Sequence, residues 1–167
     1  MIYAELGEIS SGTMRNADLI PVLTTALSNI VATNGRAGYQ ATTSVIATLA
    51  CANLMESLLD QTEGDALADD LADTEAASEL VQEIFDALQE YAPPFATFGA
   101  LEGDGACYGF WVHMDSIEEE VRDGTMLKLE AGTHAPDDWD GYVLFVNDHG
   151  NCTLQTIAPA ITHWELV

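Results

Sequence analysis

The change in hydrophobic periodicity at Pro93-Pro94 limits the fold of this chain more than any other feature of the sequence. Before the two prolines, apolar residues recur three or four positions apart, as on one face of a helix, and after them they alternate or form short runs between turn residues. A proline pair ends a helix because proline lacks the amide donor and clashes with the preceding turn. We therefore predict one α+β domain over residues 1–167, with N-terminal helices (1–92) packed on a C-terminal antiparallel β-sheet (93–167).

Four helices are predicted before the prolines from helix start and stop signals. The second of them is apolar on most sides, so we expect it to lie in the centre of the core or between two copies of the chain, as in a homodimer. The predicted helices are, in order, one from an Asn16 cap to a break at Asn34-Gly35, one over residues 43–59, a short one capped by Gly64 or Asp65, and one from a Thr74 cap to Leu88.

The region after the prolines is predicted to contain short strands and one short helix. Glycine-rich turns separate two pairs of strands, which is typical of hairpins. The predicted elements are strands 96–101 and 107–113 around the turn 102–105, a helix over 116–122 capped by Asp115 and closed by Gly124, a strand over 125–129, a hairpin of 141–147 and 152–158, and an edge strand over 162–166.

The net charge is −24, from 28 acidic and 4 basic residues, and it is unevenly distributed. Residues 1–55 hold three acids and two bases, whereas residues 56–167 hold 25 acids and two bases. Self-repulsion of this size destabilises a compact state and excludes direct binding to nucleic acid by charge attraction. The charge instead indicates a positively charged partner.

The acids between Glu56 and Glu90 number twelve, with no base among them. Many are three or four positions apart, so on a helix they form rows of neighbouring carboxylates that repel each other. Such rows resemble the phosphates of a nucleic acid, and a second acidic cluster lies between Asp115 and Asp148. The residues predicted to contact a basic partner are Asp65, Asp69, Asp70, Asp73, Glu75, Glu79, Glu83, Asp86, Glu118, Glu119, Asp137, Asp138 and Asp140.

Two other interpretations of the charge remain open. An acidic face is often only a solvated face, and salt-adapted proteins are also acidic and poor in lysine, of which this chain has one. Alternatively, the chain is a protein-interaction module in which an exposed aromatic residue such as Trp139 dominates binding.

We expect no catalytic residues, no metal and no cofactor. The sequence holds no CxxC or CxxH pair for zinc, and residues 137–141 lack the ligand order of a calcium loop. His149 and Cys152 flank a predicted turn, so we interpret them as structural and the protein as no enzyme. Three widely spaced cysteines fit free thiols of a reducing compartment, and the sequence lacks both a membrane span and the features of a secretory signal, so we expect a soluble cytoplasmic protein.

Two groups of motifs carry a resemblance and together cover about half of the chain, with residues 32–77 outside them. The first combines SGTMR and DLIP at 11–21 with IFDAL and YAPP at 84–94, and FGA, GDGA and YGFW at 98–111; the second combines DSIEE at 115–119 with GYVLFVNDHGN and TL at 141–154. These motifs resemble those of small acidic accessory proteins carried by bacteriophages and plasmids.

The resemblance implies a mobile-element origin and carries no activity over to individual residues. By analogy of charge, it favours an anti-defence protein of the anti-CRISPR or antirestriction type that mimics nucleic acid. The expected partner is a basic nucleic-acid-binding protein or complex of host defence, namely a CRISPR effector, a restriction enzyme or a nuclease, in the host cell cytoplasm.

Overall fold

The computed structural model describes residues 1–62, 65–157 and 160–166. The fold is α+β, with most helices in the N-terminal half and most strands in the C-terminal half, as predicted. The chain divides into two compact units, which we call the helical unit (Met1–Ala92 and Thr97–Trp111) and the sheet unit (Pro93–Ala96 and Val112–Val167). The sequence predicts one domain that changes element type near Pro93, whereas in the structure the strands just after the prolines group with the helices.

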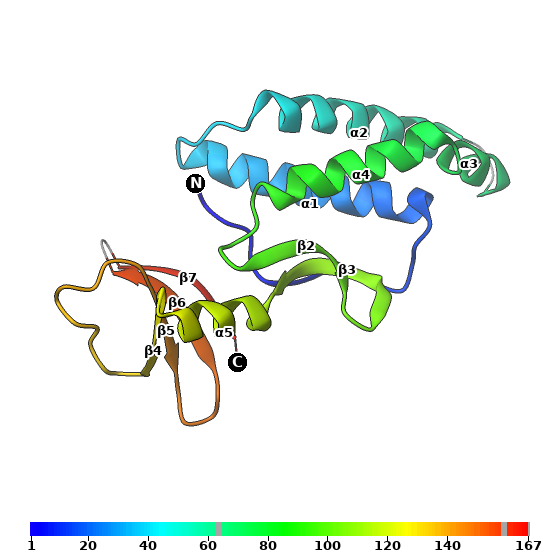
Figure 1. The fold of residues 1–167 in the computed structure, drawn as a ribbon. Coiled ribbons are helices and arrows are strands. Elements are labelled where there is room, and N and C mark those ends of the chain that lie inside the picture. Colours follow the sequence, from blue (N-terminus) through cyan, green and yellow to red (C-terminus); the bar gives the residue numbers. More distant parts are fainter. Residues whose placement is uncertain (63–64, 158–159, 167) are drawn as a thin grey trace. The chain divides into compact units, whose positions relative to one another are not determined.

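The helical unit contains four helices and a three-stranded sheet (Figure 1). The sheet has the order β1-β3-β2, and β1 runs antiparallel to β3. Its first strand, β1, is absent from the sequence prediction. The elements are β1 (Gly7–Ser10), α1 (Asn16–Arg36), α2 (Thr43–Gln61), α3 (Asp65–Ala72), α4 (Glu75–Gln89), β2 (Ala96–Leu101) and β3 (Asp104–Val112).

Side-chain caps fix the starts of two helices. The Thr74 hydroxyl accepts a hydrogen bond from the Ala77 amide at the start of α4, as predicted, and Thr42 caps α2 in the same way through Val45. For α1 the prediction of an Asn16 cap is wrong by one residue: Arg15 occupies the cap position, and its side chain makes no capping hydrogen bond. Asn16 is the first helical residue instead, and its side-chain amide donates to the Ala72 carbonyl and the Ser78 hydroxyl.

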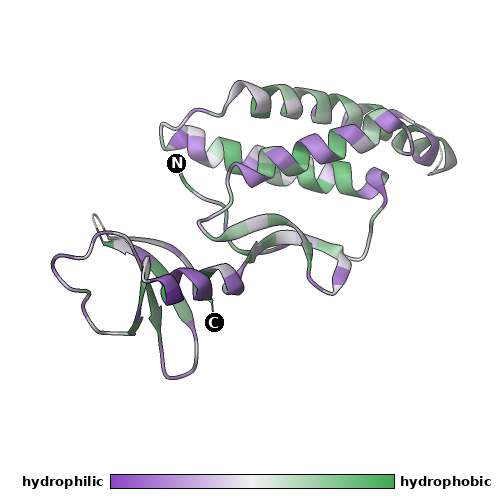
Figure 2. Ribbon diagram, in the orientation of Figure 1, coloured by the Kyte–Doolittle hydropathy of each residue, from purple (hydrophilic) through white to green (hydrophobic). Residues whose placement is uncertain are grey.

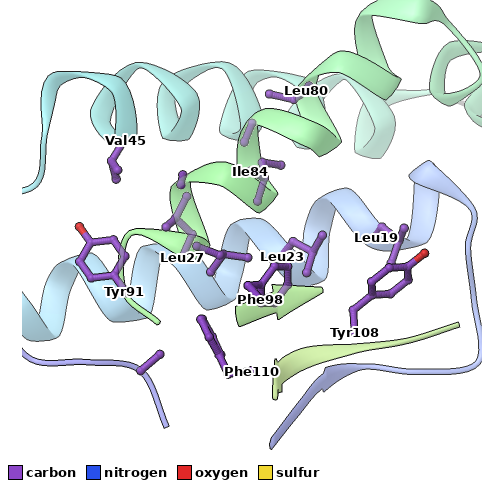
Figure 3. Close-up of a cluster of buried hydrophobic side chains, with 14 residues drawn as sticks. Leu19, Leu23, Leu27, Val45, Leu80, Ile84, Tyr91, Phe98, Tyr108 and Phe110 are labelled. Atoms are coloured by element: carbon purple, nitrogen blue, oxygen red, sulfur yellow. The ribbon is translucent and has the colours of Figure 1, made fainter. Parts of the chain in front are cut away.

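The core of the helical unit lies between the helices and one face of its sheet (Figure 3). Its aromatic layer is continuous: the rings of Phe85 and Phe98 are 5.1 Å apart, and those of Phe98 and Phe110 are also 5.1 Å apart. Each fully buried large apolar side chain contributes about 1.5–3 kcal/mol. The buried residues that build this core include Leu19, Leu23, Leu27, Val45, Leu80, Ile84, Leu88, Phe98, Tyr108 and Phe110.

The prediction that α2 is a central core helix is wrong for the chain by itself. Only Val45, Thr48 and Ala52 of this helix are buried, whereas Ile46 is 57% exposed and Leu54 63% exposed. Hydrophobic colour runs along α2 in Figure 2, whereas polar and apolar residues alternate around α4. The apolar residues of α2 cover most of its circumference, and α1 and α4 contact only part of it.

The sheet unit contains a four-stranded sheet with the order β4-β5-β6-β7. The prediction of a purely antiparallel sheet is wrong here, because β4 pairs in parallel with β5 in the register Met126↔Tyr142. The irregular segment 131–141 returns the chain to the end of the sheet at which β4 began, as a parallel pair requires. The elements are α5 (Met114–Asp123), β4 (Met126–Glu130), β5 (Tyr142–Val146), β6 (Cys152–Ile157) and β7 (Ala160–Leu166).

The ends of α5 follow from two residues that flank it. Gly124 closes the helix at a φ of 77°, a left-handed conformation that favours glycine. At the other end His113 occupies the cap position, so Asp115 lies inside the first turn and not at the predicted cap. Within the parts of the chain that the structure describes, no helix combines the length and the apolar character needed to cross a bilayer.

Candidate acidic interface

Helix α4 presents a row of carboxylates opposite its buried face. Burial of Ala77, Leu80, Ile84, Ala87 and Leu88 fixes the rotation of the helix about its axis. The acids are three or four residues apart on the other side, where Cβ atoms of such neighbours are about 5–6 Å from each other. All members of this row, which we call the α4 row, are exposed, and the helix contains no base: Glu75, Glu79, Glu83, Asp86 and Glu90.

The acids predicted on α3 are in a less uniform environment. Asp70 and Asp73 are exposed, but Asp69 is half-buried and forms an ion pair with the Arg15 guanidinium, which also lies 3.7 Å from Asp18. Asp65 is also predicted to contact the partner, but its side chain is not among those that the structure describes. Sequence reasoning missed Arg15 as a counter-ion because 54 residues separate it from Asp69.

Glu90 links the end of α4 to the start of α2. Its carboxylate accepts hydrogen bonds from the Thr42 hydroxyl at 3.0 Å and from the Ser44 hydroxyl at 3.3 Å. Thr42 also caps α2, so one hydroxyl serves both helices. These bonds hold the two helices side by side at this end.

Two adjacent hollows of about 490 Å³ and 280 Å³ lie between α2 and α4. They share Cys51 and Glu83, so we treat them as one surface and call it the α2–α4 groove. Four carboxylates of the α4 row line it. The wall from α2 is formed by Ser44, Ala47, Thr48, Cys51, Leu54, Met55 and Leu58, and the wall from α4 by Ala76, Glu79, Leu80, Glu83, Asp86, Ala87 and Glu90.

The sequence predicts Glu79, Glu83 and Asp86 of this groove as contact residues, but neither Glu90 nor the groove itself. The missed signal is the complete lack of charge over residues 37–55, which include most of the α2 wall. In a chain of net charge −24, this segment places an uncharged and largely exposed wall beside the carboxylates of the α4 row.

The second predicted acidic cluster belongs to the sheet unit. Glu118 and Glu119 are exposed on α5, and Glu119 lies 3.6 Å from Arg122. The irregular segment 131–141 carries Asp137, Asp138 and Asp140, which are all exposed, together with the half-buried Trp139. The Trp139 indole donates to the Tyr142 carbonyl at 3.3 Å, so this aromatic side chain packs back on its own unit.

The nucleophiles and bases are dispersed. All three cysteines are free, and only Cys51 is exposed. Burial raises the pKa of the Cys107 thiol, and the charges of Glu8 and Asp104 raise it further, which disfavours the reactive thiolate. The Cys152 thiol is buried and donates to the Gly150 carbonyl, while His149 lies 3.6 Å from Asp148.

Three further features bear on the binding of a metal ion or a small ligand: clusters of metal-ligating side chains, a hollow beside α1, and His163. Among the residues that the structure describes, no three His, Cys, Asp or Glu side chains are grouped so that they could hold a metal ion. A hollow of about 550 Å³ lies between the N-terminal segment and α1, and its lining includes Glu5, Glu8 and otherwise mainly apolar or hydroxyl side chains. Burial lowers the pKa of His163, whose ring lies 5.6 Å from that of Tyr142.

Comparisons with protein-family models, with curated proteins and with solved structures give no match to this chain.

Proposed function

We propose that this protein is an anti-defence protein of a phage or another mobile element, of the anti-CRISPR or antirestriction type. It acts as an acidic nucleic-acid mimic that occupies the positively charged nucleic-acid-binding site of a host defence complex. The observation that carries the proposal is the α4 row, four exposed carboxylates along one face of the helix and a fifth at its C-cap, with no base in the helix. A site built to attract phosphates through lysine and arginine responds to such a row in the same way.

The spacing of the row limits how far the imitation extends. Neighbouring acids along α4 are separated by about 5–6 Å, whereas successive phosphates of one DNA strand rise by about 3.4 Å along the axis. The row therefore supplies the sign of the charge, at a lower linear density than one DNA strand, and does not reproduce the positions of individual phosphates. Binding should be fast and salt-dependent, as is typical of association steered by electrostatics.

The partner is a basic nucleic-acid-binding protein of host defence: a CRISPR effector, a restriction enzyme or a nuclease. These enzymes act in the host cell cytoplasm, which is where the inhibitor would meet them. The proposed mechanism requires neither catalysis nor a cofactor, because inhibition follows from occupation of the site.

Two observations weigh against the alternative functions. A salt-adapted protein would place acids over its whole exposed surface, but exposed residues of α2 such as Ile46 and Leu54 lie in an uncharged segment. A module anchored by Trp139 would need that side chain to be free to enter a pocket of its partner, but it is half-buried and hydrogen-bonded to Tyr142.

Competition tests the proposal directly. Affinity capture from an infected or transformed host, followed by mass spectrometry, identifies the defence complex, and the binding of that complex to its DNA or RNA is then measured with increasing amounts of this protein. We expect mutual exclusion, and an inhibitor affinity that falls between 50 and 200 mM salt as for ligands that contact several basic groups. Simultaneous binding of the protein and the nucleic acid without loss of affinity would show that the protein is not a mimic.

A matched pair of triple variants locates the charges that matter. Reversal of Asp73, Glu79 and Glu83 to lysine should abolish inhibition. Reversal of Glu5, Glu102 and Glu130, which are also exposed but lie outside the predicted contact residues, changes the net charge equally and should retain most of it. Equal loss in both variants would mean that net charge alone, and not the row, determines binding.

A further inference from the structure

We propose that the α2–α4 groove binds a basic amphipathic helix of the partner, with the apolar side chains of that helix against α2 and its lysines or arginines against the α4 row. This inference rests on the proposed function for the nature of the partner and adds a defined docking site to it. The groove combines what a helix-binding site requires, an apolar surface for anchors one turn apart and a flanking row of charge.

The dimensions of the groove suit a helix. The residues that line its α2 wall run from Ser44 to Leu58, which corresponds to about 21 Å of helix, or four turns. Cys51, Leu54, Met55 and Leu58 supply apolar surface to the smaller hollow, and Leu54 is 63% exposed in the chain alone. A helix of about 15 residues would cover this wall over its full length.

Charge complementarity determines which occupant fits. One wall is uncharged up to Met55, and the other carries Glu79, Glu83, Asp86 and Glu90 along its length. A helix with apolar residues on one stripe and cationic residues beside it would bury the first and neutralise the second at the same time. A nucleic acid would be repelled by the same carboxylates.

The charges also argue against a second copy of this chain as the occupant. In a two-fold symmetric dimer the same patch faces itself, so each groove would bring its four carboxylates towards an identical set. Two molecules of net charge −24 would gain no compensating base, since the described residues that line the groove include none.

The test uses the full chain and a defined probe. The probe is a fluorescein-labelled helical peptide of about 15 residues, with leucines on one stripe and lysines beside it, and its binding is followed by fluorescence anisotropy. We expect Leu54→Ser combined with Leu58→Ser to weaken binding by about tenfold or more, because the loss of buried anchors has effects of this size. Ile46→Ser is the matched control: Ile46 is 57% exposed on the same helix but outside the groove, so binding should be unchanged.

The acidic wall is tested in the same assay. Glu79→Gln combined with Glu83→Gln should weaken the probe severalfold, and Glu102→Gln in the β2–β3 turn should not. If the leucine variant binds normally and all acid variants lose affinity alike, the peptide binds by unspecific charge attraction and the groove is not a docking site.

Cys51 gives a measurement that does not depend on the stability of a variant. It lines both hollows and is the exposed cysteine, so a bulky maleimide on its thiol should block the probe. Bound peptide should conversely slow the alkylation of Cys51. Full probe affinity after complete modification of Cys51 would overturn the proposal.

The last arm separates this inference from the proposed function. With the identified defence complex, the Leu54→Ser and Leu58→Ser variant should lose inhibition and the complex should protect Cys51. If inhibition is retained and Cys51 stays reactive, nucleic-acid mimicry remains supported and the groove proposal is wrong. If the complex protects Cys51 while still binding its nucleic acid, the groove proposal is supported and nucleic-acid mimicry is wrong. Analytical ultracentrifugation compares the oligomeric state of the unmodified protein with that of the leucine variant. If the unmodified protein is a dimer and the variant is a monomer, the groove binds a second copy of the chain and the proposal is overturned.

Discussion

Helices α2 and α4 form the two walls of one groove, yet they differ in how their apolar residues are spaced and in how many of them are buried. Helix α4 has apolar residues at helical spacing and buries five of them, with Ile84 and Leu88 completely inaccessible, while Val81 and Phe85 are partly buried. Helix α2 is more uniformly apolar but buries only three residues and leaves Leu54 and Leu58 exposed. Periodicity, and not hydrophobicity as such, therefore indicates which side of a helix faces the core.

The two helices also show how charge and apolar surface are balanced in this chain. The like charges of α4 oppose folding by a few tenths of a kcal/mol per neighbouring pair, which is small beside the burial of its apolar face. The exposed apolar residues of α2 would favour self-association, whereas repulsion between copies of net charge −24 opposes it. This repulsion would help to keep the proposed docking surface accessible to a basic partner.

The largest expected difference between the helices is in the effect of truncating one aliphatic side chain. Ile84→Ala in α4 should lower the free energy of unfolding by about 2–5 kcal/mol, because it opens a cavity in the core. Leu54→Ala in α2 should change it by less than about 0.5 kcal/mol, since this side chain is mainly exposed. Urea unfolding measures both. A cost for Leu54→Ala similar to that of Ile84→Ala would show that the face of α2 is covered in solution.

The reactivity of the cysteines tests the exposure of α2 independently. Cys51 should react with a small alkylating reagent at least about tenfold faster than Cys107, which is 5% exposed. Because burial and the charges of Glu8 and Asp104 raise the pKa of Cys107, its rate should keep rising with pH beyond the range in which an ordinary thiol is already ionised. Mass spectrometry of quenched samples at several pH values separates the two sites. Equal rates would contradict the structure around β3.

The helix caps give a smaller difference. Thr74→Ala removes the α4 cap and should lower the free energy of unfolding by about 1 kcal/mol. Thr42→Ala removes the α2 cap together with the bond to Glu90, so it should cost more, by about 0.5–1.5 kcal/mol. A double-mutant cycle of Thr42→Ala with Glu90→Ala isolates the link between the helices. No coupling would mean that the Thr42–Glu90 hydrogen bond does not stabilise the packing of α2 against α4 at this end.

Local signals in the sequence were sufficient for most elements but not for their association. The Thr74 cap and the Gly124 helix end depend on neighbouring residues, and both are found as predicted. The β2–β3 hairpin turns at Gly103 as expected, but β3 begins at Asp104, three residues before the predicted strand. Strand β1 has four residues, too few for a pattern, and it is held by pairing with β3 about 100 residues away. Gly109 permits this pairing, because a Cβ there would lie 2.1 Å from the Gly7 carbonyl oxygen.

The candidate site shows the same limit. Exposure of the α4 row follows from helical spacing and was predictable. The pairing of Arg15 with Asp69, the link from Glu90 to Thr42 and the groove itself depend on how distant helices pack, which spacing within one segment does not encode. The parallel pairing of β4 with β5 was missed for the same reason, since two short strands fit either orientation.

The smallest expected effect concerns the charges of the two helices. Glu83 has like-charged neighbours at Glu79 and Asp86, so Glu83→Gln should raise the free energy of unfolding by about 0.4–1 kcal/mol. On α2, Glu56 has one such neighbour, Asp60, and Glu56→Gln should give about half of that gain. Both gains should shrink in 1 M salt, where the screening length is about 3 Å. Urea unfolding in low and high salt measures them. A loss of stability on neutralising Glu83, or a gain that salt does not reduce, would mean that this carboxylate has a favourable partner within the fold and does not contribute to an open row.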